Sequence, residues 1–324
     1  MTPWRILALP PLDESLLRGM VSPLGASLLL PATRDAAGLH AALATAELVI
    51  GDFTGTLAMD AEAVACAPDL AFVQMPQVGV DSCDLPALTS AGVPVANTAG
   101  ANARSVAEWA VGAAFALCRH LAWGDREVRA GRWPQSQLLA RGAREIHTQR
   151  VGILGLGAIG TQAASLFEAL GCAVSYWSRT PRTSGSYRPL DELLATSDLL
   201  VVCLPLNAET TDLLDAERLA LLPRGALLVN VARGGIVSES ALAAALDSGA
   251  LAGAALDVFA AEPPAIDDPL RSHPNVLLSP HVAGATGQAQ LNIVSLVIEN
   301  LTAAVQGRPV RNVVNDVAPL VRRR

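Results

Sequence analysis

The segment "VGILGLGAIG", residues 151–160, decides the fold of this chain. A short apolar run leads into Gly155, Gly157 and Gly160, and the helical pattern "TQAASLFEALG" follows. In a strand–turn–helix unit of this kind, the first glycine makes the tight turn and the second lets the backbone approach a pyrophosphate. The third lets helix and strand pack closely. Since the helix N-terminus also offers free N–H groups to phosphate, the segment predicts a nucleotide-binding turn rather than a loop that merely needs small residues.

The next apolar run, "CAVSYW" at 172–177, ends where dinucleotide-binding folds usually carry an acidic residue. Ser178, Arg179 and Thr180 stand there instead. A carboxylate would accept the ribose hydroxyls and repel a 2′-phosphate, whereas two hydroxyls and a guanidinium fork can bind that phosphate. Arg182 offers a second positive charge nearby. The stretch favours NADP(H), with NAD(H) or an ordinary solvated loop as the open alternatives.

Apolar runs alternate with helical patterns on both sides of this turn, which predicts an α/β fold with parallel sheets covered by helices on both faces. Because the alternation restarts from residue 151, two doubly wound sheets and therefore two domains are expected. The strands predicted in the first part are "RILAL", "SLLLP", "ELVIG" and "AFVQM". Those predicted in the second part are "RVGILG", "AVSYW", "DLLVVCLP", "ALLVNVA", "AGAALDVF" and "NVLLSPH".

Two longer segments have helical patterns. The first runs from Ser105 to Trp133 as one continuous pattern that could bridge the two domains. The second, "GQAQLNIVSLVIENLTAAVQG", ends at Gly307, a residue type that commonly terminates helices.

Composition excludes several classes of protein. The longest apolar run, "WAVGAAFALC" at 109–118, is about half of the roughly 20 residues that cross a membrane. The opening "MTPWRILALPPLDES" turns polar too early for a signal peptide, so the cytoplasm is expected. A net charge of -7 argues against nucleic acid as a partner, and the terminal run Arg322–Arg324 is expected to be a solvated tail.

Cysteine and histidine give little sign of metal chemistry. The five cysteines are scattered, odd in number and without a CxxC pair, so they are expected to be reduced packing residues with no metal or disulfide. Four histidines are expected to have surface or structural roles: His40, His120, His147 and His273.

Polar residues follow three of the predicted strands, where ligands bind in such sheets. Arg233 follows "LLVNVA", Asp257 and Glu262 follow "AGAAL", and His281 follows "NVLLSP". A guanidinium can hold a substrate carboxylate and polarise its carbonyl, while an imidazolium can deliver a proton as hydride reaches the carbon. A carboxylate would orient the imidazole, although Asp257 and Glu262 could instead cap local turns. The set suits the reduction of a 2-keto acid.

These features occur among motifs that extend over nearly the whole chain. The motifs are "QVGVDSCDL" (77–85), "VANTAGANARSVAEWA" (95–110), "VGILGLGAIG", "LPLNAETTDLL" (204–214), "LVNVARGGIV" (228–237), "LDVFAAEP" (256–263) and "SPHVAG" (279–284). With them the chain resembles the D-isomer-specific 2-hydroxyacid dehydrogenases, the family of glyoxylate, hydroxypyruvate and phosphoglycerate dehydrogenases.

The resemblance implies a domain plan and a site. A Rossmann cofactor domain at 99–286 would be inserted into a flavodoxin-like substrate domain made of 1–98 and 287–324, with catalysis in the cleft between them. The implied catalytic residues are Arg233, Glu262 and His281. The implied substrate-binding residues are Arg233 and His281 with the amides near Val78 and Gly79, and Asn102. The implied cofactor-binding residues are Gly155, Gly157, Ala158, Ile159, Gly160, Ser178, Arg179, Thr180, Leu204, Pro205, Val231, Ala232, Asp257, Ala283 and Gly284.

The resemblance also implies a homodimer, with the surface from Trp109 to Trp133 between the copies. Its "SRT" is similar to the corresponding stretch of NADPH-preferring glyoxylate and hydroxypyruvate reductases, while "MPQVGVD" departs from the commoner "RxGxGVD" loop and leaves side-chain specificity open. No regulatory domain is expected after Arg324.

The leading hypothesis is therefore an NAD(P)H-dependent oxidoreductase that interconverts a small 2-keto acid, such as glyoxylate or hydroxypyruvate, and a D-2-hydroxy acid. A nucleotide-sensing binding protein of the corepressor type is one alternative, against which the intact Arg233, Glu262 and His281 argue. A dehydrogenase of another small anion, such as formate or phosphite, is the other, and no residue pattern favours it.

Overall fold

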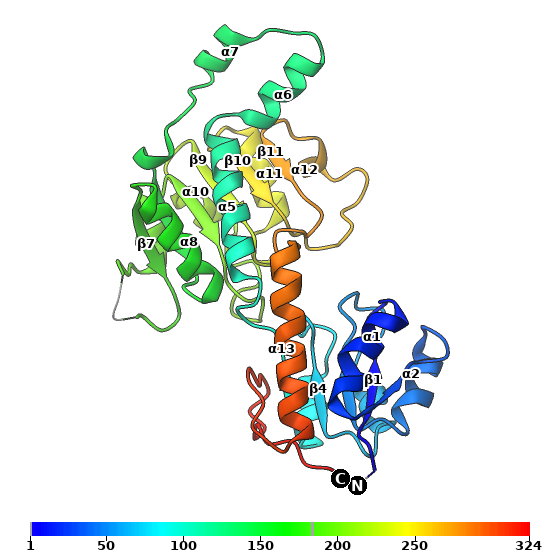
Figure 1. Cartoon of the computed structure of the whole chain (residues 1–324). Helices are drawn as coiled ribbons and strands as arrows, with labels where there is room; N and C mark the ends of the chain where they lie inside the picture. Colours follow the sequence, from blue (N-terminus) through cyan, green and yellow to red (C-terminus); the bar gives the residue numbers. More distant parts are fainter. Residues whose placement is uncertain (1, 183–184) are drawn as a thin grey trace. The chain divides into compact units, whose positions relative to one another are not determined.

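The computed structural model describes residues 2–182 and 185–324 (Figure 1). The chain divides into two compact units, of which unit 1 comprises Met1–Asn102 with Gly287–Arg324 and unit 2 comprises Ala103–Thr286. The first boundary lies at residue 102 rather than at the expected 98, so Asn102 belongs to unit 1. Each unit is built on a parallel sheet with helices on its faces, which confirms the predicted α/β fold class.

The sheet of unit 1 has the strand order β2-β1-β3-β4-β5 within the described residues. Every neighbouring pair is parallel, and the order is that of flavodoxin-like sheets. The strands are β1 Arg5–Ala8, β2 Ser27–Leu29, β3 Leu48–Ile50, β4 Phe72–Gln74 and β5 Val95–Ala96. The sequence predicted the first four. It missed β5, because two residues are too few to show a periodic pattern.

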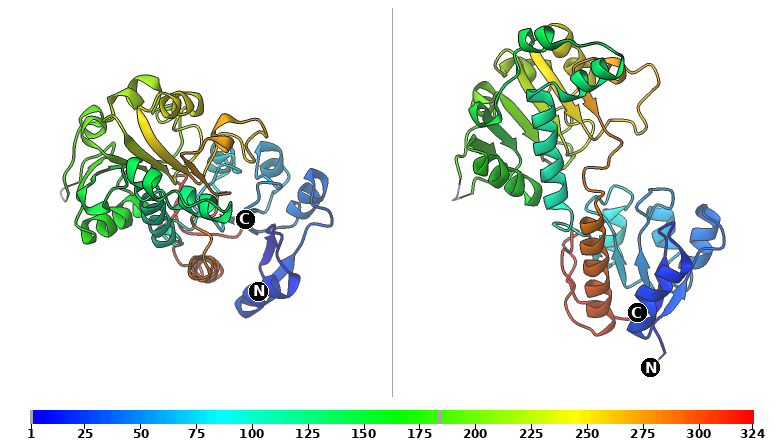
Figure 2. Two further views of the ribbon diagram at one scale, coloured as in Figure 1. Left: turned by 90° about the horizontal axis from the view of Figure 1, so that it is seen from above. Right: turned by 45° about the horizontal axis from the view of Figure 1, so that its top comes forward.

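Four of the helices described in unit 1 begin after an aspartate that caps the first turn. The helices of this unit are α1 Glu14–Val21, α2 Ala36–Leu43, α3 Ala61–Ala65, α4 Leu85–Ser90 and α13 Gly287–Val305, with the 3-10 turn η1 Ser22–Leu24. Figures 1 and 2 show α13 beside β4, where Asn300 Nδ2 donates to Gln74 Oε1 at 2.7 Å. Gly307 follows the helix with φ +66°, which confirms it as the predicted terminating residue.

The terminal arginine run is not the solvated tail that was predicted. The guanidinium of Arg323 lies over the Trp4 ring at 4.6 Å and binds Glu47 at 2.5 and 3.2 Å. It also donates to the backbone oxygen atoms of Thr2 and Pro3. This cluster holds the two ends of the chain together on unit 1, where both termini lie in Figure 1.

The sheet of unit 2 has the order β11-β10-β9-β8-β6-β7 among the described residues, and all its pairs are parallel. Its strands are β6 Arg150–Leu154, β7 Ala173–Trp177, β8 Leu199–Val202, β9 Ala226–Asn230, β10 Leu251–Leu256 and β11 Val276–Leu278. The chain order reverses between β6 and β8. Ligands of doubly wound sheets bind at such a switch point, and the glycine turn follows β6 there.

Helices cover both faces of this sheet over two separate apolar cores. They are α5 Ala103–Cys118, α6 Leu121–Arg129, α7 Gln135–Ala140, α8 Ala158–Ala169, α9 Leu190–Thr196, α10 Ala216–Leu221, α11 Glu239–Asp247 and α12 Pro269–Ser272, with η2 Ile146–Thr148. The prediction of one helix from Ser105 to Trp133 is wrong. His120 adopts φ +51° and separates α5 from α6, which extends with α7 beyond the sheet in Figure 1.

Two absences apply to the part of the chain that the structure describes. None of its helices combines the length and hydropathy needed to cross a membrane, and no group of histidine, cysteine and acidic side chains gathers as a metal site would require. The five cysteines are free, and burial raises the pKa of the Cys203 thiol to about 12, as expected of a packing residue.

Candidate active site

The glycine turn has the geometry that its sequence predicts. Gly155 has φ +103°, and a Cβ there would lie 2.9 Å from the backbone oxygen of Cys203 at the end of the neighbouring strand β8. A Cβ on Gly160 would lie 1.9 Å from Gly155 O, so α8 packs directly on the turn. At Gly157, by contrast, nothing lies within 4 Å of the added atom, and no side chain caps α8. The open approach and the uncapped helix fit a pyrophosphate, with Ala158 exposed and Ile159 partly buried in the first turn.

The "SRT" stretch follows β7 at the same edge of the sheet. Ser178 Oγ donates to Thr180 O at 2.8 Å, which shapes the turn. Arg179 is 80 % exposed, and its Nη1 lies 3.5 Å from Glu209 Oε2, itself 72 % exposed. Such an exposed pair is weak, so the guanidinium remains accessible to a stronger anion. Arg182 has its backbone held by the Tyr176 hydroxyl at 2.8 Å.

Arg233 stands on a turn that packs against the loop after β10. Its Nη1 donates to Ala232 O at 2.8 Å, and the buried Asn230 braces the turn by donating to Arg233 O at 3.1 Å. A Cβ on Gly234 would lie 1.8 Å from the carbonyl carbon of Phe259. Only glycine allows this approach, which brings the arginine turn onto the loop that carries Glu262.

His281 and Glu262 form a direct pair. Glu262 Oε2 lies 2.7 Å from His281 Nδ1, while Oε1 accepts from Phe259 N at 3.0 Å. The carboxylate is thus anchored on its own loop and fixes the imidazole through one nitrogen. The His281 side chain is 46 % exposed, so its other nitrogen is free to meet a substrate.

Asp257 supports the histidine loop from beneath. It is 2 % exposed, and its carboxylate accepts from Val282 N and Ala283 N, both at 2.8 Å, and from the Ser279 hydroxyl. His281 N donates to Asp257 O at 2.8 Å, and the histidine backbone has φ +54°. Asp257 therefore sets the loop conformation. The expected contact of Asp257 with the cofactor stays a prediction.

In unit 1, the loop after β4 carries Val78 and Gly79. Asn97, buried at the end of β5, donates from Nδ2 to Val78 O at 2.7 Å, and Thr98 N donates to Gln77 O at 3.1 Å. These bonds turn the carbonyls of the loop toward the protein. Within the described residues, Asn102 Oδ1 is a buried acceptor with no hydrogen-bond partner, as a group that meets a ligand or a water would be.

The other expected cofactor residues lie on loops that follow β8, β9 and β11. Leu204 is partly buried and Pro205 is exposed after β8, while Val231 and Ala232 are buried after β9. Ala283 is buried and Gly284 partly buried after β11. All these loops leave the carboxyl edge of one sheet, which is where a dinucleotide binds in such folds.

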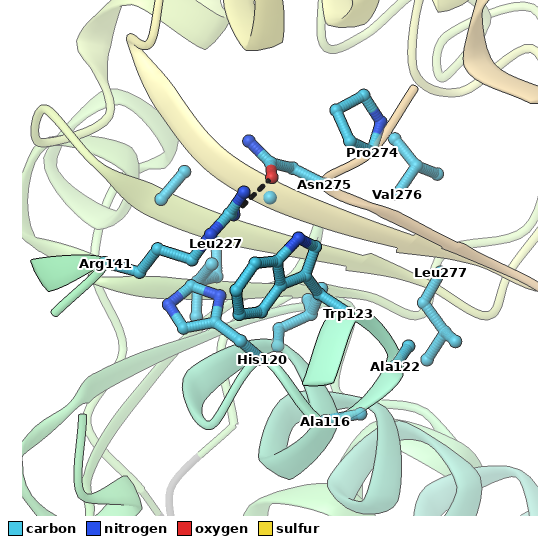
Figure 3. A pocket seen from close by; sticks show the side chains of 13 residues that line it. Ala116, His120, Ala122, Trp123, Arg141, Leu227, Pro274, Asn275, Val276 and Leu277 are labelled. Atoms are coloured by element: carbon cyan, nitrogen blue, oxygen red, sulfur yellow. Dashed lines mark hydrogen bonds between the residues drawn. The ribbon is translucent and has the colours of Figure 1, made fainter. Parts of the chain in front are cut away.

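A small cavity of about 30 Å³ lies near the opposite end of the same sheet (Figure 3). His120, Trp123 and Arg141 line it, the Arg141 guanidinium lying 4.2 Å from the Trp123 ring centre and donating to Asn275 Oδ1 at 3.3 Å. A volume near that of one water excludes a metabolite. The cluster instead fastens the start of α6 to the sheet. Burial lowers the pKa of His120, consistent with the structural role predicted for it.

A parallel-sheet nucleotide unit with a histidine–carboxylate pair at its carboxyl edge is typical of nicotinamide-dependent dehydrogenases. Residues 111–283 match the family model of the D-isomer specific 2-hydroxyacid dehydrogenase NAD binding domain. The chain is 36 % identical over 275 residues to the glyoxylate reductase of Aeropyrum pernix, covering 82 % of each protein. The chain therefore belongs to the D-isomer-specific 2-hydroxyacid dehydrogenase family, as its motifs predicted, and a nicotinamide cofactor is supported.

Two further similarities mark the range of the family. The D-3-phosphoglycerate dehydrogenase of Archaeoglobus fulgidus is 36 % identical over 79 % of this chain, which spans about half (49 %) of that relative. An NADPH-dependent glyoxylate/hydroxypyruvate reductase from Sinorhizobium meliloti, solved in complex with NADP and malonate, has a TM-score of 0.84. Its identity is 31 %, and 100 % of each chain is covered.

Sequence reasoning missed the residues that position the site. Asn97 and Asn230 hold the turns that carry Val78 and Arg233, and Glu239 Oε1 accepts from Ala260 N at 2.7 Å on the Glu262 loop. A weak signal was present, since Asn230 is a single polar residue in the apolar run "ALLVNVA". A buried polar side chain at a strand end usually has a specific partner.

Proposed function

We propose that this protein reduces a small 2-keto acid to the D-2-hydroxy acid with NADPH, and that glyoxylate or hydroxypyruvate is the kind of substrate it takes. The observation that supports this best is the 2.7 Å pair of His281 and Glu262 beside the glycine-supported turn of Arg233. A proton donor held by a carboxylate and a guanidinium at one sheet edge are what carbonyl reduction requires.

The proposed site residues bind the substrate carboxylate, polarise its carbonyl or supply the proton. Arg233 holds the substrate carboxylate and polarises the carbonyl, and the amides of Val78 and Gly79 bind the same carboxylate. His281 gives a proton to the carbonyl oxygen, while Glu262 keeps the imidazole oriented. The nicotinamide cofactor, when bound, supplies the hydride. Gly157 and the N-terminus of α8 would hold its pyrophosphate.

The preference for NADPH rests on the stretch after β7. Ser178, Arg179 and Thr180 include no carboxylate, and the exposed Arg179 can exchange its 3.5 Å contact with Glu209 for a charge-assisted bond to a 2′-phosphate. The NADP complex of the similar reductase from Sinorhizobium meliloti agrees with this preference.

The exposed apolar side chains on α6, on α7 and between them support a homodimer. Leu121, Val128, Trp133 and Leu139 are 56 %, 51 %, 80 % and 77 % exposed. Large exposed apolar side chains on a projecting segment favour an interface, and two-fold dimers are the commonest soluble assemblies.

A substrate panel tests the proposal. The purified protein is assayed with glyoxylate, hydroxypyruvate and pyruvate, each with NADPH and with NADH, by the loss of reduced nicotinamide absorbance. We expect turnover with at least one acid and a higher kcat/KM with NADPH. Arg233→Lys keeps the charge but loses the planar fork, so it should lower kcat/KM by about 100-fold. Binding of NADPH without turnover of any 2-keto acid would instead favour a nucleotide-sensing protein.

A further inference from the structure

The carboxyl ends of the five strands of unit 1 lie at one edge of its sheet, because all described strand pairs there are parallel. Ligands of such sheets bind beyond this edge. The loops that leave it are 9–13, 30–35, 51–60, 75–84 and 97–102, all within the described residues. The charges of these loops therefore decide which substrates unit 1 can accept.

The helix N-termini at this edge already carry carboxylates. The helices α1, α2, α3 and α4 begin after aspartates whose side chains accept from backbone N–H groups of the first turn. These are Asp13 from Ser15 N and Asp35 from Gly38 N at 2.8 Å, and Asp60 from Ala63 N and Asp84 from Ala87 N at 2.9 Å. Because each carboxylate occupies a first-turn donor and its negative charge offsets the dipole that would attract an anion, these four ends disfavour a phosphate.

The contrast with unit 2 is internal to the molecule. The helix α8, at the nucleotide turn, begins at Gly157 and has no side-chain cap. In unit 2 the N-terminus of α8 is thus available to the phosphates of the proposed cofactor. In unit 1 each of the four helix N-termini at this edge is capped by an aspartate.

The loops of the unit 1 edge contain one basic residue, Arg34, and the whole chain contains no lysine. Arg34 Nη2 lies 2.7 Å from Asp52 Oδ2, and its Nη1 donates to Leu9 O at 2.6 Å. The Asp52 side chain is fully buried and also accepts from Thr54 N and Leu57 N. Since a buried carboxylate holds its counterion firmly, this guanidinium serves to lock the loops rather than to bind substrate.

Uncharged surface completes the edge. Leu12, Leu30 and Phe53 follow β1, β2 and β3, and their side chains are 42 %, 39 % and 43 % exposed. Apolar groups at a ligand-binding edge favour substituents without charge.

We propose that unit 1 selects 2-keto acids whose only charge is the reacting carboxylate and rejects those that carry a second anionic group, such as a phosphate or a second carboxylate. This inference rests on the proposed function and specifies its substrate class. A second anion would lose its hydration, meet no free cation on the described loops of this edge and lie near fixed aspartates.

Matched pairs of substrates test it. With NADPH, kcat/KM is measured for hydroxypyruvate against 3-phosphohydroxypyruvate and for 2-ketobutyrate against oxaloacetate. We expect the doubly anionic member of each pair to be at least about 100-fold poorer. A value within about threefold of the uncharged partner, or above it, overturns the inference while leaving the reductase activity standing. Failure with all four acids and with glyoxylate, in a protein that still binds NADPH by fluorescence, overturns the proposed function instead.

A variant locates the selectivity. Phe53→Arg places a cation on the edge and should raise the ratio of kcat/KM for 3-phosphohydroxypyruvate over hydroxypyruvate by about 10-fold, more at low salt. Phe53→Gln, which removes the ring without adding charge, should leave that ratio within about twofold. Both melting temperatures are recorded to confirm folding. An unchanged ratio in folded Phe53→Arg would assign the selectivity to residues outside this edge and overturn the inference.

Discussion

At the residue scale, the contact between Glu262 and His281 is the feature on which the proposed proton transfer depends. Glu262→Gln keeps the shape but removes the negative charge that faces the imidazole. We expect kcat/KM for reduction to fall by about 10- to 100-fold, because a neutral amide orients the proton donor less firmly. The measurement is kcat/KM for reduction at neutral pH.

Glu239→Gln is the matched control, because Glu239 binds the same loop at Ala260 N without touching the imidazole. Its kcat/KM for reduction should stay within about twofold of the parent value. An equal kcat/KM in the parent and in Glu262→Gln would show that the carboxylate does not position the proton donor.

The proposed preference for NADPH is also decided at this scale, by Arg179. Replacing it with alanine removes a charge-assisted bond of roughly 1.5–3 kcal/mol, so kcat/KM with NADPH should fall by about 10- to 100-fold while the value with NADH changes little. Glu209→Gln removes the carboxylate that lies 3.5 Å from the Arg179 guanidinium. It should therefore raise kcat/KM with NADPH. Equal losses of kcat/KM with NADPH and with NADH would show that residues 178–180 form an ordinary solvated loop.

At the scale of elements, we expect two glycines of the turn between β6 and α8 to have different roles. Gly160 is needed for folding, and Gly157 for cofactor binding. Gly160→Ala forces a Cβ to within 1.9 Å of Gly155 O, and should lower the free energy of unfolding by about 3 kcal/mol. Gly157→Ala meets nothing within 4 Å, so the free energy of unfolding should change by less than about 1 kcal/mol. The added methyl group would occupy the open side of the turn, where the pyrophosphate is proposed to bind. The affinity for NADPH should therefore fall about 10-fold.

Denaturant unfolding and NADPH titration of both variants check this pair. The assignment of roles would be wrong if Gly157→Ala unfolded as easily as Gly160→Ala or bound NADPH as tightly as the parent.

At the scale of the whole molecule, Glu47 joins the two ends of the chain, because it accepts hydrogen bonds from both Arg323 and Arg5. Burial by itself raises the pKa of this carboxyl, but the bonds from Arg323 and Arg5 outweigh it and hold the pKa below its usual 4.5. A lowered value contributes stability above the unfolded pKa that is lost as pH falls through the folded one. Arg323→Ala should therefore lower the free energy of unfolding by about 1–2 kcal/mol at pH 7, with a smaller effect below about pH 4.

Unfolding in urea at several pH values measures this effect. Arg322→Ala, at the exposed neighbouring position, is the control and should change stability by less than about 0.5 kcal/mol. A loss from Arg323→Ala that does not vary with pH would assign the effect to its stacking on Trp4 and its bonds to Thr2 and Pro3 rather than to Glu47.

The assembly belongs to this scale as well. Light scattering should give twice the 33.5 kDa mass of one chain, because Trp133 and Leu139 expose apolar surface that a partner would cover. Trp133→Asp should shift the population toward monomer, whereas Leu320→Asp, a similar change on an exposed leucine of unit 1, should not. A parent protein that is monomeric at micromolar concentration rules the dimer out.

Local pattern accounts for what the sequence predicted well. The apolar runs became strands and Gly155, Gly157 and Gly160 formed the expected turn, because apolar periodicity and the spacing of glycines are patterns of neighbouring residues along the chain. The break at His120 was missed because its residues suit a helix. Arg141, which lies over the Trp123 ring and donates to Asn275 at the distant sheet edge, fastens the segment that follows this left-handed residue.

By itself, then, the sequence determined the family, the two parallel sheets and the residue types available for catalysis. Only the tertiary structure decided which of them meet: Glu262 with His281, Asn97 with Val78, and Arg323 with Glu47, which is 276 positions away. The physical reason is that parallel strand pairing brings the ends of distant segments to one edge. A side chain finds its partner there through sheet register and turn geometry, which no local pattern encodes.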